Sequence, residues 1–307
     1  MSALAASVQF QSNWWDVLQT GFMRNALLGG SLVAIAAGLL GYFVVTRSNA
    51  FAAHALAHIG FPGATGAILV GAPVTLGLAV FCLGGGLLIG LLGRRVAERE
   101  IATGTVLAFA TGLGVLFGSL ASANASTTTS VLFGNLLAVS DDELVVFALF
   151  TAAVVVVLAL VARPLVFASV DPAVAEARGV PVRALGVAFV VLLALTITMA
   201  VQVVGTLLLF GLVVTPAATA LRLTARPGRV AAISVAIALL SVWTGLVLAA
   251  MFNLPPSFFV VTVSVLTWAT VLTATRRRGR TASGGGGHGG GGHTSDVVPT
   301  ASRAAAL

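Results

Sequence analysis

The sequence of 307 residues contains no lysine, so all of its 16 basic residues are arginines. A phosphate-binding loop of the G-x-x-x-x-G-K-[ST] type needs a lysine, and so does Schiff-base catalysis; both chemistries are excluded. The single cysteine, Cys82, excludes intrachain disulfides and thiolate clusters. No HExxH motif occurs, and the acidic run 141–143 has no histidine or serine partner of recognisable spacing. We therefore expect no catalytic activity in this chain.

Charged residues are also scarce, at 8% of the chain against roughly 25% in an ordinary soluble domain. Hydrophobic residues make up 58%, more than a soluble globule of this size could bury. The net charge of +7 does not come from a soluble basic face, so nucleic acid is not an expected partner. The composition instead predicts an all-α polytopic protein that spans a lipid bilayer.

Long apolar runs recur along the sequence, and each is long enough to cross a bilayer at 1.5 Å per residue. They predict about nine transmembrane helices, near residues 25–45, 51–71, 74–93, 101–121, 144–162, 184–202, 203–221, 230–250 and 257–274. The boundary between the sixth and seventh runs is marked only by Gln202. If the N-terminus is outside and the runs alternate, every arginine except Arg24 lies inside, as the positive-inside rule expects. We therefore predict an outside N-terminus and an inside C-terminus.

Three regions follow from this pattern. Residues 1–23 are expected to form an interfacial segment because they carry tryptophans and no basic residue. Residues 24–275 form the transmembrane domain, in which the short run 131–139 is expected to be re-entrant or interfacial. Residues 276–307 form a basic, Gly/His-rich inner tail with the composition of a flexible linker. His288 and His293 could buffer metal ions there, and an inert linker is the alternative.

Two histidines in the second apolar run are the clearest candidates for chemistry, since ionisable groups are costly inside a bilayer. His54 and His58 are four residues apart, which places both imidazoles on one helical face. Neutral imidazole is a good ligand for zinc and other transition ions. The pair therefore predicts a weak, transient metal site on a translocation path. The alternative is that both histidines only form hydrogen bonds to neighbouring helices.

A short inner segment between the fifth and sixth runs predicts a capped helix. Asp171 is a suitable N-cap, Pro172 suits the first helical position and Gly179 suits the end. We expect this helix to dock a soluble partner through residues that include Ala175 and Glu176. An ordinary capped loop is the alternative.

A late apolar run contains Thr215 and Pro216, which predict a broken or bent helix on the pathway. Proline is tolerated in membrane helices, so this signal is weak when taken alone. The Thr215–Pro216 segment is more informative when it is taken together with several other motifs in their order along the chain.

Taken in order, these motifs resemble the permease subunits of ABC importers for zinc and manganese. The segments that carry the resemblance are Ala55–His58 with Pro62–Gly63, Leu132–Gly134 with Leu137–Ser140, Asp171–Pro172 with Ala175 and Gly179, Gln202–Leu208, and Thr215–Ala218. The resemblance implies a homodimeric permease of a prokaryotic cell membrane. Its implied partners are two cytoplasmic ATP-binding subunits and an extracytoplasmic metal-binding lipoprotein. His58 matches the family's histidine, whereas the family usually has an aspartate at the place of His54.

The expected function is therefore the permease of an ATP-driven divalent-metal importer, with the segment Asp171–Gly179 as coupling helix and no permanently bound cofactor. Zinc is favoured over manganese because imidazole pairs suit zinc and the apolar runs contain almost no carboxylates. An ion-coupled secondary transporter is the alternative, although the intramembrane Asp or Glu expected for coupling is missing. A non-transporting membrane scaffold would need neither the paired histidines nor the docking helix.

Overall fold

The computed structural model of the protein describes residues 14–92, 96–121, 131–206 and 209–284, and within these ranges it is helical without β-strands. This confirms the all-α fold. The helices, in chain order, are α2 (Trp14–Leu18), α3 (Gly21–Thr46), α4 (Ala50–Val70), α5 (Val74–Leu92), α6 (Val96–Leu120), the 3-10 turn η1 (Leu136–Ala138), α8 (Asp141–Val170), α9 (Pro172–Ala177), α10 (Val182–Val204), α11 (Leu209–Val213), α12 (Thr215–Leu223), α13 (Pro227–Phe252) and α14 (Pro256–Gly284).

Seven of these helices are long and apolar enough to cross a membrane: α3, α4, α6, α8, α10, α13 and α14. The remaining two predicted runs correspond to shorter apolar stretches, Val74–Gly90 in α5 and Leu209–Leu223 across α11 and α12. The count of nine crossings and the orientation of the termini therefore stay predictions. The last helix also continues to Gly284, beyond the boundary that the sequence suggested at residue 275.

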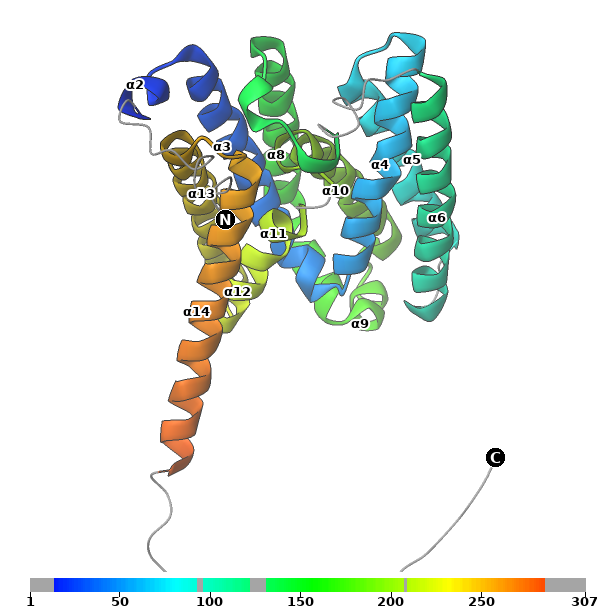
Figure 1. The fold of residues 1–307 in the computed structure, drawn as a ribbon. Helices are drawn as coiled ribbons and strands as arrows, with labels where there is room; N and C mark the ends of the chain where they lie inside the picture. The colour runs from blue at the N-terminus through cyan, green and yellow to red at the C-terminus, as the bar shows by residue number, and fades with distance from the viewer. Residues whose placement is uncertain (1–13, 93–95, 122–130, 207–208, 285–307) are drawn as a thin grey trace, which may run out of the picture.

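The helices form two groups, and the helices α8 and α10 lie between them (Figure 1). On one side α4 packs against α5 and α6, and on the other α3 packs against α13, which also contacts α14. Between them α10 contacts α3, α4, α5 and α8. Close approaches occur in both groups; in the second, a Cβ added to Gly38 of α3 would lie 2.7 Å from the Cα of Val235 in α13. Glycine is therefore required for these two helices to touch.

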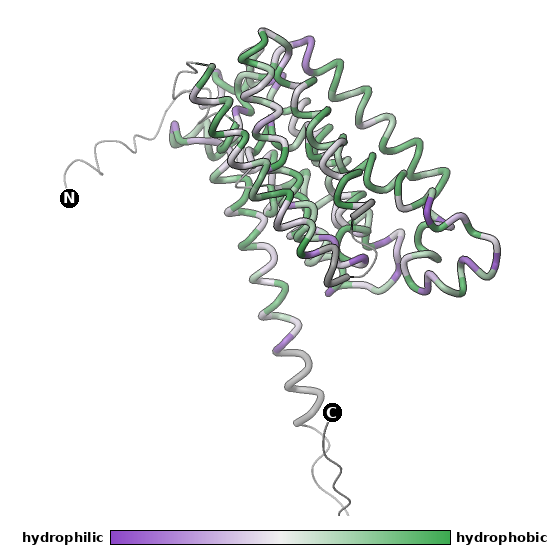
Figure 2. Tube along the Cα trace, turned by 90° about the vertical axis from the view of Figure 1, so that its right-hand side faces the viewer, coloured by the Kyte–Doolittle hydropathy of each residue, from purple (hydrophilic) through white to green (hydrophobic). Residues whose placement is uncertain are grey.

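The outer faces of the bundle are apolar. Hydrophobic residues run along the helices, whereas hydrophilic residues gather near helix ends and connections (Figure 2). Large side chains such as Ile101 and Phe109 on α6 and Leu160 on α8 are more than 70% exposed. Such a surface suits the acyl chains of a bilayer and would be unfavourable in water.

The end of the bundle opposite to α9 is closed by a folded-back segment. Val131, Leu136 and Val139 are buried and Phe133 is 50% exposed, so the re-entrant or interfacial placement of residues 131–139 stays a prediction. Here Gly134 crosses Gly205, the residue at which α10 ends, and both have positive φ values of 76° and 87°. A Cβ on Gly134 would lie 2.6 Å from the nitrogen of Gly205. Backbone therefore meets backbone at this crossing, with no room for a side chain.

Two backbone hydrogen bonds reinforce the crossing. The Asn135 N–H donates to the Gln202 carbonyl over 3.0 Å, and the Thr206 N–H donates to the Val131 carbonyl over 3.3 Å. The Gln202 side chain accepts from the Thr75 hydroxyl over 3.0 Å and donates to the Thr198 carbonyl. The boundary that the sequence left near Gln202 thus lies at Gly205, where these bonds replace the helical ones.

Candidate metal pathway

Helix α4 positions both histidines close to its first residue, Ala50. The rings of His54 and His58 are 4.8 Å apart between centroids and meet edge to face at 78°. Both side chains are half-buried. This separation lies within reach of one ion bound about 2.1 Å from a nitrogen of each ring. The structure therefore brings together the two groups that the sequence predicted as transient ligands.

One nitrogen of this pair has no protein partner. The Nδ1 atom of His54 is buried and makes no hydrogen bond, which is uncommon because buried polar atoms are nearly always paired. The alternative role, in which the histidines form hydrogen bonds across helices, does not account for this atom. An unpaired ring nitrogen is what a passing metal ion needs as a ligand.

The neighbour of His54 across the bundle is Phe210 of α11, whose ring centroid is 6.5 Å away. Phe210 is 43% exposed and was not singled out from the sequence. A phenylalanine in an apolar run gives no signal of its own, and only the fold shows that it faces the histidines. Among the described residues, no group of three or more His, Cys, Asp or Glu side chains could hold a metal ion. The two histidines are therefore the candidate ligands among the described residues, and their role stays a prediction.

The broken helix lies next to this pair. Helix α11 ends at Val213 and α12 begins at Thr215, with Pro216 in its first turn. Gly41 of α3 faces the break, and a Cβ added there would collide with the Val213 carbonyl oxygen. Phe210, which contacts His54, belongs to α11, so the helix that ends at the break also contacts the histidine pair. Whether Thr215 and Pro216 shape the metal path stays a prediction.

The expected coupling segment, α9, contacts α8 and α10. The Asp171 carboxylate accepts a hydrogen bond from the Val174 N–H over 3.0 Å, and Gly179 has a φ of 80°. Ala175 is fully buried inside the permease, so it contributes no docking surface, contrary to the role that we expected for it. Val174 and Glu176 are exposed instead.

The remaining candidates are not tested by the structure. His288 and His293 lie outside the described residues, as do residues 1–13 of the interfacial segment.

The acidic residues that follow residues 131–139 have structural roles. Ser140 and Glu143 form a capping box at the start of α8, and Asp141 accepts a hydrogen bond from the Asn25 side chain over 2.8 Å.

The known proteins to which this chain is similar are membrane transport proteins. The family model described as the ABC 3 transport family matches residues 19–275. The manganese transport system membrane protein MntC of Listeria innocua is 29% identical over 251 residues, covering 81% of this chain and 89% of the relative. The manganese import system permease protein ScaB of Streptococcus parasanguinis is 32% identical, over 66% and 72% respectively. Among solved structures, PsaBC from Streptococcus pneumoniae in complex with Fab matches with a TM-score of 0.76 at 27% identity, covering 85% of this chain and 94% of that chain.

Proposed function

Because the chain belongs to the ABC 3 transport family, we propose that this multi-pass membrane protein forms the path of an ATP-driven importer of divalent metal ions, with zinc as the favoured cargo. The observation that carries the proposal is the half-buried pair His54 and His58, with one buried ring nitrogen that lacks a partner. A conducting site must release its ion, so two ligands suit a path better than a complete cage.

The choice of metal follows from the ligands. Imidazole suits zinc, whereas carboxylate and water suit manganese. The curated relatives are named for manganese, which makes manganese the alternative cargo. In the family that this chain resembles, an aspartate usually stands at the place of His54. The histidine at this position therefore supports a shift of preference towards zinc.

We further propose a homodimer with cytoplasmic ATP-binding subunits and an extracytoplasmic metal-binding protein. Helix α9 supports the coupling role because Val174 and Glu176 are exposed beside a rigid, capped turn. A push on α9 is transmitted directly to α8 and α10, which it contacts.

The test is metal uptake into proteoliposomes that contain the permease, its ATPase and its binding protein. His58→Ala is expected to abolish zinc uptake with the complex still assembled, while Phe51→Ala, an exposed position on the same helix, leaves uptake unchanged. His54→Asp should raise manganese uptake relative to zinc. Normal uptake by the double alanine variant of His54 and His58 would remove the pair from the path.

The same vesicles separate the importer from an ion-coupled secondary transporter. Uptake by the importer requires ATP on the side of the ATPase and stops when the ATPase subunit is omitted. A secondary transporter would instead take up metal without the ATPase when an ion gradient is imposed. Metal uptake that depends only on the gradient would contradict the proposal.

A further inference from the structure

A large cavity opens between helix ends at the side of the bundle where α9 lies. Its volume is about 1110 Å³, and it is formed by the end of α3, the starts of α4 and α10, and the ends of α5 and α8. Four polar side chains line it: Arg47, Asn49, Ser169 and Arg183. None of the described lining residues is acidic. The cavity therefore combines a positive charge with a mostly aliphatic wall.

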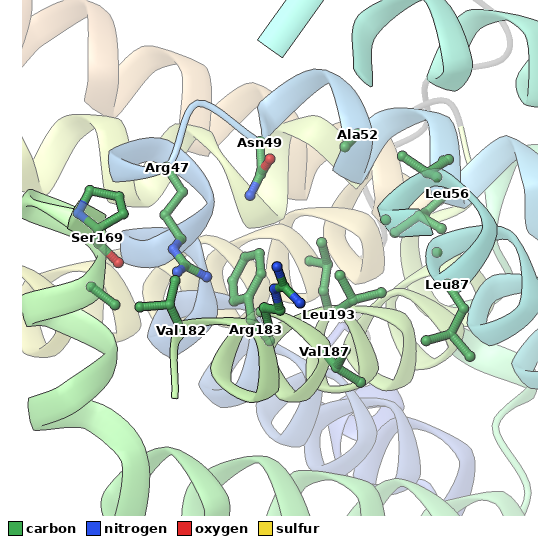
Figure 3. A pocket seen from close by; sticks show the side chains of 18 residues that line it. Arg47, Asn49, Ala52, Leu56, Leu87, Ser169, Val182, Arg183, Val187 and Leu193 are labelled. Atoms are coloured by element: carbon green, nitrogen blue, oxygen red, sulfur yellow. The ribbon is translucent and has the colours of Figure 1, made fainter. Parts of the chain in front are cut away.

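The polar and apolar residues are unevenly distributed over the wall. Arg47 and Ser169 lie on the left of the view and Leu56 and Leu87 on the right, with Arg183 between them beside Val187 and Leu193 (Figure 3). The polar residues come from helix ends, whereas the aliphatic wall continues along α10 to Leu193, about 15 Å from Arg183 at 1.5 Å per residue. The wall changes from cationic at the helix ends to apolar towards the middle of the bundle.

Two further features suit a ligand in this cavity. The guanidinium of Arg47 lies over the ring of Phe189, 5.2 Å from its centroid, and this contact fixes its position at the mouth. On the apolar side, Leu87 is 39% and Val187 53% exposed, so the wall is accessible from the surface of the bundle. The interior also has spare room, because a Cβ added to Gly186 would meet nothing within 4 Å.

The cavity is separate from the proposed metal path. Ala52 and Leu56 of α4 line it, and each is two residues from a histidine of the pair. Successive helical residues are about 100° apart, so residues two positions apart point to nearly opposite sides. The cavity and the histidines therefore use opposite faces of α4, and the occupant of one need not bind at the other.

We propose that this cavity is a binding site for an anionic phospholipid, with its phosphate at Arg47 and Arg183 and an acyl chain along Leu56, Leu87 and Leu193. A soluble anion would gain nothing from 15 Å of aliphatic wall, whereas a lipid matches both parts. The arginine distribution predicts that this end faces the cytoplasm, where basic pockets between transmembrane helices bind acidic headgroups.

Native mass spectrometry of the purified full chain tests the site, with phosphatidylglycerol titrated against phosphatidylcholine of the same acyl chains. Phosphatidylglycerol should bind more tightly. Arg47→Gln and Arg183→Gln should each weaken its binding about fivefold, the effect of removing one interfacial arginine. Arg229→Gln, an exposed arginine in the first turn of α13 that does not line the cavity, is the matched control and should leave binding unchanged.

The acyl-chain part has its own variant. Gly186→Leu fills the cavity without an initial clash and keeps both arginines, so it should weaken phosphatidylglycerol at least as much as the loss of one arginine. Glycerol 3-phosphate, the soluble probe, should bind weakly to every variant. Arg183→Lys should retain binding, which separates loss of charge from misfolding. Equal binding of the two lipids, or full binding by Gly186→Leu, would overturn the proposal, the second by showing a site for phosphate alone.

Discussion

The two ends of this bundle are built in opposite ways. At one end Gly134 and Gly205 touch backbone to backbone, and hydrogen bonds hold residues 131–139 against the end of α10. At the other, five helices diverge around a cavity of about 1110 Å³. A contact without side chains has no freedom to adjust, whereas a cavity tolerates movement of its walls. From this difference we infer that the helices move more easily at the end near α9, the segment proposed to couple to the ATPase.

Disrupting the contact between Gly134 and Gly205 should have the largest effect on stability. Gly205→Ala places a Cβ 2.5 Å from the nitrogen of Gly134 at a φ of 87°, a conformation that alanine rarely adopts. We expect a loss of about 3 kcal/mol in stability and little folded protein. Thermal unfolding and the monodisperse yield in detergent measure it.

The control for Gly205→Ala is Gly186→Ala, at the end of the bundle that holds the cavity. A Cβ at Gly186 meets no atom within 4 Å, so this variant should be neutral or slightly stabilising. Equal tolerance of alanine at Gly186 and Gly205 would contradict the difference between the two ends.

The second prediction concerns α9. Val174→Arg adds a bulky charge to an exposed position, so it should abolish coupled transport while the permease inserts at its normal level. ATP hydrolysis and metal uptake are measured together in proteoliposomes. Ala175→Arg provides the contrast, because a charge at this fully buried position should destabilise the permease itself. Wild-type coupling in Val174→Arg would mean that α9 is not a docking element.

A smaller effect is expected where side chains support the closed end. Thr75→Val removes the hydroxyl that donates to Gln202 and links α5 to α10. The loss should be about 1 kcal/mol, the usual net contribution of one hydrogen bond. Thermal unfolding detects it, with Thr105→Val as the control because that exposed hydroxyl bonds only within its own helix. A Thr75 variant no less stable than the Thr105 variant would show that the link contributes nothing.

The smallest effect is expected from the tail. Deletion from Ser283 onwards should leave folding and uptake unchanged, since this segment has no apolar pattern to bury. Metal titration of a peptide containing His288 and His293 then decides between a buffer and an inert linker. Micromolar zinc binding would support the buffer, and reduced folding of the truncated chain would contradict the prediction.

The sequence predicted the helices well because each apolar run carries its own length and composition. It predicted the His54–His58 face because the spacing of four is a local property of a helix. Phe210 and the cavity could not be predicted, since they depend on which helices lie side by side. The docking role predicted for Ala175 does not agree with its burial, because the sequence of a six-residue helix is too short to show which of its faces is buried. The continuation of α14 to Gly284 was missed because arginines indicate a membrane boundary and are also good helix formers.

The contact of α3 with α13 has a consequence for biogenesis. Helix α3 is synthesised first among the long apolar helices, yet the partner of its Gly38 is Val235, almost two hundred residues later. The ribosome adds about 5–20 residues per second, so α3 waits roughly ten seconds or more in the membrane with its glycine face uncovered. A chain that stops before α13 therefore leaves an exposed small-residue surface, which favours association with other helices. Insertion of α13 is therefore the step that covers Gly38 of α3.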